Sequence, residues 1–205
     1  MARRSDHSRE ELKDMILKTS WRIIGAEGSD ALSARRIAGE IGYTPGTIYN
    51  LFASMDDLYL QLNTRTLDAL YDVLTSPACN DPAKKPVTNM KKMASLYMAF
   101  ARDNRPYWLM LFSHRSAEGG KEPAWYREKI DRLFTPLEHI LDPLFKQQQG
   151  RKRKMAARVL WSSVHGLCFL QQTGRISLVG GKAGTDDLAG YLIETFVAGI
   201  ESGRS

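Results

Sequence analysis

The chain has 205 residues, of which 43% are hydrophobic and 25% are charged. This composition is typical of a globular protein with one core, or with a small module attached to a larger one. No apolar stretch approaches the ~18 residues that a membrane-spanning helix needs. The basic start at Arg3 and Arg4 is followed by Asp6 rather than by the apolar segment of a signal peptide. We therefore expect a cytoplasmic protein with no membrane partner.

The two cysteines, Cys79 and Cys168, lie far apart in unlike surroundings. Neither a disulfide framework nor a metal site is expected, and no sequence motif indicates a cofactor. The net charge of +6 is compatible with nucleic-acid binding. Only a small part of it lies near the start of the chain, where residues 1–54 hold eight Lys and Arg against seven Asp and Glu. The basic run at 151–154 is interpreted as a solvated loop or helix end.

The apolar pattern is helical nearly throughout, and no stretch alternates as a strand would. Ser8 and Glu11 form a capping box that predicts the start of a first helix. Ser33 is expected to cap a second helix, which Gly42 ends. A third short helix follows, and Ser54 with Asp57 predicts the start of a long helix that reaches about residue 74.

Further helices are expected at about 88–103, 105–114, 123–149, 152–172 and 186–202. The one at 123–149 should be kinked near Pro136 or Pro143. The glycine-rich stretch between the last two helices lacks the spacing of a phosphate-binding loop, so it is interpreted as a flexible connection. The sequence thus predicts an all-α protein of about nine helices.

Residues 33–52 have the pattern of a helix-turn-helix, with two short helices separated by Gly-Tyr-Thr. The longer stretch SARRIAGEIGYTPGTIYNLFASMDDL, residues 33–58, resembles the DNA-binding signature of the TetR repressors. The resemblance implies a three-helix DNA-binding domain at 8–68 and a helical ligand-binding and dimerisation domain at 69–205. WSSVHGL, residues 161–167, is similar to the Trp-His-Gly motif of one subgroup of TetR ligand domains.

The third helix, PGTIYNLF, contains neither lysine nor arginine. At ~100° per residue, Pro45, Ile48 and Phe52 share the face that should pack inward. The opposite face carries small and polar groups suited to DNA: hydroxyls for phosphates, the Asn50 amide for adenine and the Leu51 side chain for a thymine methyl. The expected DNA contacts are Arg3, Arg4, Ser33, Arg35, Thr44, Pro45, Gly46, Thr47, Tyr49, Asn50 and Leu51.

Several of these residues also have a simpler interpretation. Leu51 lies at the edge of both faces and could belong to the core, and Arg35 could be an ordinary solvated charge. Two positions depart from the TetR pattern. Met55 stands where the family usually has a phosphate-contacting lysine, and Leu51 stands where a histidine or aromatic residue is common.

Aromatic residues cluster after residue 90, and such a stripe is usually core. The resemblance implies a ligand cavity among these helices, for which the candidates are Trp108, Phe112, Trp125, Trp161, His165 and Phe169. His165 could equally be a core histidine. The helix at 152–172 has one face with small side chains in its middle, and the last helix has apolar residues at intervals of four. Together they predict a four-helix dimer interface. Its expected members are Val159, Ser162, Gly166, Leu170, Leu192 and Phe196.

The sequence favours a DNA-binding transcriptional regulator, a homodimeric repressor on a palindromic double-stranded operator that a small apolar ligand releases. The alternative is a DNA-binding regulator without a small-molecule inducer, controlled by a protein partner or by abundance. An α-helical enzyme is the third hypothesis. The four histidines show no metal-binding spacing and no nucleophile motif is present, so an enzyme is not expected.

Overall fold

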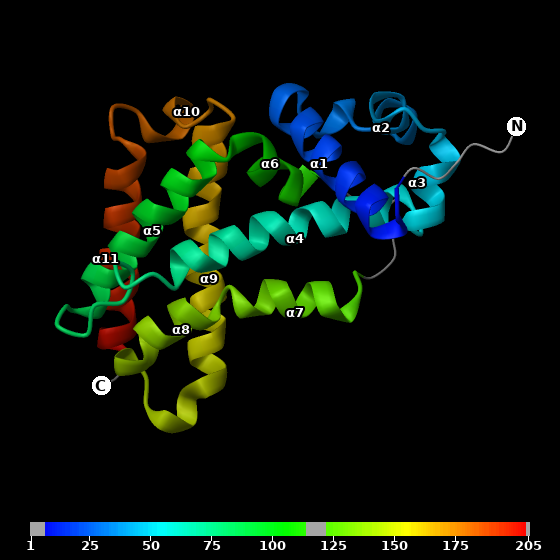
Figure 1. Cartoon of the computed structure of the whole chain (residues 1–205). Helices are drawn as coiled ribbons and strands as arrows, with labels where there is room; N and C mark the ends of the chain where they lie inside the picture. Colours follow the sequence, from blue (N-terminus) through cyan, green and yellow to red (C-terminus); the bar gives the residue numbers. More distant parts are fainter. Residues whose placement is uncertain (1–6, 114–121, 204–205) are drawn as a thin grey trace, which may run out of the picture. The chain divides into compact units, whose positions relative to one another are not determined.

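The computed structural model describes residues 7–113 and 122–203, so Arg3 and Arg4 lie outside the described residues. The described part of the chain consists of helices and turns without a strand, which confirms the predicted all-α fold (Figure 1). It divides into two compact units. The first contains the described residues up to Thr66 and those between Pro106 and Tyr126, and the second contains Leu67–Arg105 and the described residues from Arg127 onward.

Three helices and the start of a fourth build most of the first unit. They are α1 (Arg9–Glu27), α2 (Ala34–Ile41), α3 (Pro45–Leu51) and α4 (Met55–Leu74), with the single turn η1 (Ser29–Ala31) between α1 and α2. α2 packs against both α1 and α3, as in a helix-turn-helix. α4 contributes its residues up to Thr66 to the first unit and the rest to the second.

The predicted helix starts are confirmed by their caps. The Ser8 amide donates to the Glu11 carboxylate at 2.6 Å, and the Glu11 amide donates to the Ser8 hydroxyl at 3.2 Å. The Asp57 amide likewise donates to the Ser54 hydroxyl at 3.1 Å at the start of α4. Gly42 ends α2 with φ of 76°, a left-handed conformation that glycine adopts without strain. The caps therefore mark where α1 and α4 begin and where α2 ends.

The core of the first unit is mostly aliphatic and lies where α1, α2, α3 and α4 meet. Leu58 and Leu62 on α4 pack with Met110 of α6 (Arg105–Ser113). The other fully packed members, from α1 to α3 and the turns beside them, are Ile16, Ile23, Ile24, Leu32, Ala34, Ile37, Ala38, Ile48 and Phe52. Such a continuous buried cluster holds α3 in one orientation.

The second unit is built on three long helices that lie side by side: α5 (Pro86–Asp103), α9 (Gly150–Gln172) and α11 (Thr185–Ser202) (Figure 1). α8 (Thr135–Leu141) packs against α5 and α9. None of the described helices is long and apolar enough to cross a membrane.

The single kinked helix predicted at 123–149 is wrong. The chain instead forms α7 (Ala124–Arg132), then α8, and then the single turns η2 (Asp142–Leu144) and η3 (Gln147–Gln149). Pro136 lies in the first turn of α8 and Pro143 in the first turn of η2. Each proline lacks an amide donor, so each starts a new segment rather than bending an old one. The glycine-rich stretch, predicted as a flexible connection, also contains the one-turn helix α10 (Ser177–Gly180).

Candidate nucleic-acid interface and ligand cavity

α3 has one buried and one exposed face, as its sequence predicts. Ile48 and Phe52 are fully buried in the core of the first unit. Gly46 and Asn50 are exposed, and Tyr49 keeps 54% of its surface accessible. Pro45 was expected on the inward face, but it is exposed because it occupies the first helical position, before the helix meets the core.

The two positions after Asn50 are less available than a helical wheel suggests. Leu51 and Met55 are both partly buried and pack against the core of the first unit. Leu51 can therefore present only one edge to a partner. The Met55 side chain is engaged in packing at the position where a phosphate-contacting lysine would need to extend into solvent.

The start of α3 combines free space with an unused hydroxyl. Thr44 caps α3 by backbone geometry alone, and its side chain makes no capping hydrogen bond. A Cβ placed on Gly46 would meet nothing nearer than the Thr44 hydroxyl at 3.8 Å. Packing within the unit therefore does not require glycine at position 46.

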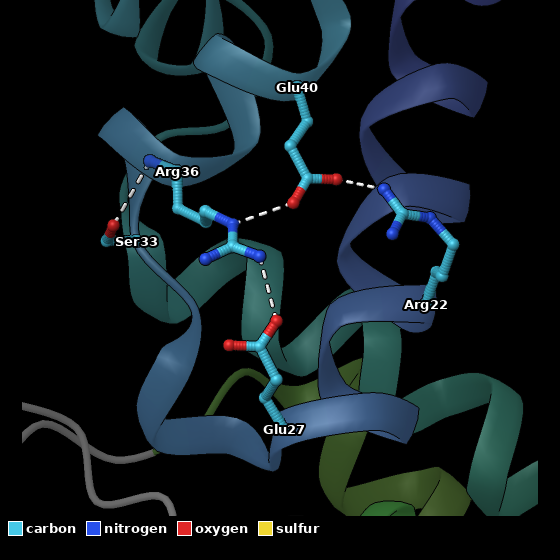
Figure 2. A network of polar contacts seen from close by, with 5 residues as sticks. All are labelled: Arg22, Glu27, Ser33, Arg36 and Glu40. Atoms are coloured by element: carbon cyan, nitrogen blue, oxygen red, sulfur yellow. Dashed lines mark hydrogen bonds and ion pairs between the residues drawn. The ribbon is translucent and has the colours of Figure 1, made fainter.

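An ion-pair network joins α2 to α1 (Figure 2). The Arg36 guanidinium donates to Glu40 at 2.7 Å and to Glu27 at 2.8 Å, while Arg22 of α1 also binds Glu40. The Arg36 amide donates to the Ser33 hydroxyl at 3.2 Å. Hydrogen bonding from Arg36 lowers the pKa of Glu40. Two arginines and two glutamates thus neutralise one another, so this network adds no net charge for DNA.

The basic side chains near α3 that remain available to DNA lie outside this network. Arg35 is exposed and forms no ion pair with any described residue, so it is available to a phosphate. Arg9 donates to the main-chain oxygen of Asn50 at 3.3 Å, and the Lys13 ammonium lies 5.6 Å from the centre of the Phe52 ring. The sequence alone did not indicate Arg9 and Lys13 as DNA contacts. Their spacing of four along α1 places them on one helical face, but only tertiary packing brings that face to α3.

The second unit contains a small cavity of about 40 Å³ that is lined only by uncharged residues. The walls come from α4, α5, the α8 region, α9 and α11. They consist of Leu74, Met90, Met93, Ala94, Tyr97, Leu133, Phe134, Leu137, Leu160, Trp161, Val164 and Ile193. This volume is room for roughly three water molecules.

His165 lies beside this cavity in a set of aromatic contacts. Its Nδ1 is 2.8 Å from the Tyr97 hydroxyl, and its ring stacks on Trp161 with centroids 4.9 Å apart. Phe134 meets Trp161 edge-on at 5.6 Å. Burial lowers the pKa of His165 below its ordinary value, so the imidazole is neutral at neutral pH. It can accept or donate a hydrogen bond at the cavity edge.

The structure does not bring the six predicted ligand residues together. Trp108, Phe112 and Trp125 belong to the first unit, where Trp108 is fully buried and packs on Phe112 at 4.9 Å. Trp161, His165 and Phe169 lie on α9 in the second unit, and of the six only Trp161 is among the cavity-lining residues. An aromatic stripe in the sequence does not reveal which of two cores each ring joins.

The residues predicted for a dimer interface lie on two adjacent helices. Val159 on α9 is 48% exposed, and Ser162 and Gly166 are exposed on the same side. Leu192 and Phe196 on the neighbouring helix α11 are half-buried. Leu170 is half-buried near the end of α9. α9 and α11 pack along each other, so these side chains lie on adjacent helices of one unit.

Two family profiles match this chain. Residues 16–62 match the bacterial regulatory proteins of the tetR family, and residues 90–196 match the tetracyclin repressor-like C-terminal domain. The matches do not confirm the Trp-His-Gly subgroup. The chain is also 25% identical over 189 residues to an uncharacterized HTH-type transcriptional regulator of Mycobacterium tuberculosis, covering 92% of this chain and 81% of that protein.

Solved structures share the fold. A protein of unknown function from Rhodococcus sp. RHA1 superposes with a TM-score of 0.70 at 18% identity, covering 96% of this chain and 98% of the other. The multidrug binding protein EbrR, solved in complex with imidazole, gives a TM-score of 0.61 at 19% identity, covering 93% and 96%. Because the second profile spans more than half of the chain and the first spans the helix-turn-helix, the protein belongs to the TetR family of DNA-binding transcriptional regulators.

Proposed function

We propose that this protein is a repressor that binds a palindromic operator as a homodimer and leaves it when a small uncharged apolar compound binds the second unit. The observation that carries the DNA-reading part is the exposed polar face of α3 on the tightly packed first unit. Buried Ile48 and Phe52 fix the helix, and the opposite face presents Gly46 and Asn50.

The chemistry of this face favours recognition of A·T pairs. The exposed Asn50 amide can donate to and accept from adenine in the major groove. The accessible edge of Leu51 suits a thymine methyl. The hydroxyls of Thr44, Thr47 and Tyr49 suit phosphates, as does the guanidinium of Arg35, and these contacts position the helix without reading sequence. Contacts from the tail residues Arg3 and Arg4 remain part of the prediction.

The exposed face on α9 and α11 supports a homodimer. Val159, Ser162 and Gly166 recur at helical spacing, and their small size lets a second pair of helices approach closely. Joined with Leu192 and Phe196 of α11, they complete a four-helix interface. One α3 reads too few bases for a specific site, whereas a two-fold dimer reads two half-sites one helical turn apart.

The apolar cavity supports regulation by a small molecule. All of its lining side chains are uncharged, so an ionised ligand would lose its hydration without gaining a counter-charge. His165 and Tyr97 could bind one polar group at its edge, as the resemblance of Trp161 and His165 to the Trp-His-Gly motif would imply. A relative of similar fold, EbrR, is named for multidrug binding.

The cavity is so small that binding of a ligand must change the structure around it. Ligand sites for drug-sized molecules usually hold about 300–1,000 Å³, far more than the 40 Å³ present. A ligand must therefore push the cavity walls apart, and Met90 and Met93 are side chains that adapt readily. α4 supplies Leu74 to the cavity and Leu58 to the core around α3. A movement of α4 on ligand binding would therefore change the position of α3.

The same small cavity also favours the second candidate function, a regulator that takes no small molecule and responds to a protein partner or to its own abundance. The two can be separated with matched compounds. A neutral aromatic compound such as 2-naphthol is compared with its charged analogue 2-naphthoate for binding in calorimetry and for release of DNA.

The experiment begins with selection of duplexes from a random pool by the purified protein. Enrichment of a palindrome, together with a dimer in sedimentation, is the expected result. Release by 2-naphthol and not by 2-naphthoate supports the ligand-controlled repressor. Enrichment without release by any neutral aromatic compound favours the second candidate, and enrichment of no duplex contradicts both.

A further inference from the structure

α3, the helix proposed to contact the bases, carries no positive charge, and the cations beside it lie on α1. We propose that Arg9 and Lys13 of α1 contact the DNA phosphates beside α3 and replace the charge that Met55 does not supply. This inference rests on the proposed operator binding and adds two residues that the sequence did not indicate. Arg9 donates a hydrogen bond to the main-chain oxygen of Asn50 at 3.3 Å.

That hydrogen bond places Arg9 at the C-terminal end of α3, next to the proposed base-reading residue. The last carbonyls of a helix have no partner within it and form the negative end of its dipole, so a guanidinium is stable there. One amino group of Arg9 serves Asn50, and the guanidinium has further donors. Arg9 is exposed and forms no ion pair with any described carboxylate, so these donors are available to a partner.

Lys13 lies one turn after Arg9 on the same face of α1. Its ammonium lies 5.6 Å from the centre of the Phe52 ring, the residue that directly follows α3. No described carboxylate pairs with it. Arg9 and Lys13 together therefore place two uncompensated cations beside the end of α3. By contrast, Lys18 farther along α1 pairs with Asp14 at 2.6 Å, and Arg22 and Arg36 are held in the network of Figure 2.

The length of α3 makes a phosphate contact geometrically reasonable. Its seven residues extend about 10 Å, close to the ~12 Å width of the major groove. When the middle of so short a helix meets base edges, its end lies near a groove wall, and phosphates line that wall. Met55, at the usual place for a lysine, packs against the core and cannot serve there.

A structural role alone would also explain Arg9, because its hydrogen bond to Asn50 could simply cap α3. The salt dependence of DNA binding separates the two roles, since each neutralised phosphate contributes about 0.9 to the log–log slope. With Arg9, Lys13 and Arg35 on each subunit, a dimer should show a slope of about −5. A cap would change affinity but leave the slope unaltered.

The test uses the full-length protein and a labelled duplex enriched from a random pool, with dissociation constants measured by fluorescence anisotropy over a series of NaCl concentrations. Arg9→Gln and Lys13→Gln should each make the slope shallower by about one unit per subunit. Arg9→Lys keeps the charge and should keep the slope. Lys18→Gln is the matched control on the same helix and should also keep it.

A wild-type slope in Arg9→Gln would overturn the assignment, because it means that Arg9 acts only through its bond to Asn50. Thermal melting of each variant shows that the helices remain folded. Failure to enrich any duplex contradicts operator binding itself and removes the inference with it, so the two failures are distinguishable.

Discussion

The ring of Tyr107 lies flat on the indole of Trp21, with centroids 3.8 Å apart and planes 9° from parallel. The guanidinium of Arg65 lies 4.4 Å from the Trp21 ring. The Tyr107 hydroxyl also donates to the Trp21 carbonyl at 3.2 Å. α6 is thereby fixed to α1 inside the first unit, while Arg105, two residues earlier in the chain, donates to the Gln172 carbonyl of α9 inside the second. The start of α6 is therefore anchored separately in each unit.

This stack predicts that Gly25 cannot be enlarged. A Cβ at Gly25 would lie 2.4 Å from the Tyr107 hydroxyl, so Gly25→Ala must displace a ring that stacking holds in place. We expect a loss of about 1–3 kcal/mol in the free energy of unfolding. Gly39→Ala is the control, because nothing lies within 4 Å of its Cβ, and it should gain about 0.5–1 kcal/mol from helix propensity. Urea denaturation measures both, and equal effects would contradict the prediction.

Gly46→Ala should separate DNA binding from stability. Within the protein the added methyl meets only the Thr44 hydroxyl at 3.8 Å, so stability should stay the same or rise by up to about 1 kcal/mol. If the backbone of α3 approaches the duplex closely, the methyl occupies the space between them and affinity for the selected duplex should fall at least about tenfold, or 1.4 kcal/mol. Anisotropy titration checks this, and unchanged affinity would show that the start of α3 stands away from DNA.

Filling the apolar cavity should stabilise the protein and block the ligand. Ala94→Val adds two carbons to the cavity wall and should raise the free energy of unfolding by about 0.5–1 kcal/mol. The control is Ala101→Val, also on α5 and fully buried but outside the lining residues, which should lose about 1–3 kcal/mol by overpacking. The Ala94 variant should bind DNA and no longer release it with 2-naphthol. Release at the wild-type concentration would place the ligand elsewhere.

Gly166→Leu should disrupt the proposed dimer without harming the single chain. A Cβ at Gly166 meets nothing within 4 Å, so the larger side chain is tolerated in the subunit but holds a second α9 away. We expect monomers in sedimentation velocity and at least about a hundredfold weaker operator binding, because one half-site is read alone. Ala198→Leu, an exposed position on another side of α11, should remain dimeric. A dimeric Gly166→Leu would refute this interface.

Stability should decrease in mild acid through His165. Burial lowers its pKa in the folded protein below the ordinary 6.5, so below that pH the unfolded chain takes up the proton first. The part of the free energy of unfolding that depends on a neutral His165 is fully present above pH 6.5. It is lost as the pH falls toward the folded-state pKa, by at most about 1.4 kcal/mol per pH unit. His165→Asn, which cannot ionise, should show a smaller drop in Tm between neutral and mildly acidic buffer. An identical drop would assign the acid sensitivity to other groups.

Local patterns accounted for much of the first unit. The hydroxyls of Ser8, Ser33 and Ser54 mark helix starts because they bond amides only three residues away. The inward face of α3 followed from helical spacing, since Ile48 and Phe52 are four residues apart. Interactions of this range are contained in the sequence itself, so the helix-turn-helix and its exposed residues could be predicted without knowing what they pack against.

The broken helix at 123–149 shows the limit of periodicity. Its apolar spacing is continuous enough for one helix, and Pro136 could have produced either a kink or a new start. The structure ends α7 at Arg132 and begins α8 at Thr135. α8 packs against α5 and α9, and its residues Leu137, Ile140 and Leu141 are buried. Tertiary packing therefore decided between two outcomes that the local sequence allows.

The sequence by itself determined most of the helices, the caps that begin α1, α2 and α4, the family and the face of α3 that remains exposed. Only the tertiary structure decided which partners each face meets. It placed Trp108 and Trp161 in different units, packed Leu51 and Met55 against the core, and brought Arg9 to Asn50 across 41 residues of chain. The physical reason is that helical periodicity specifies which side of a helix is apolar. The contacts between distant segments depend on how all the helices fill one another's grooves.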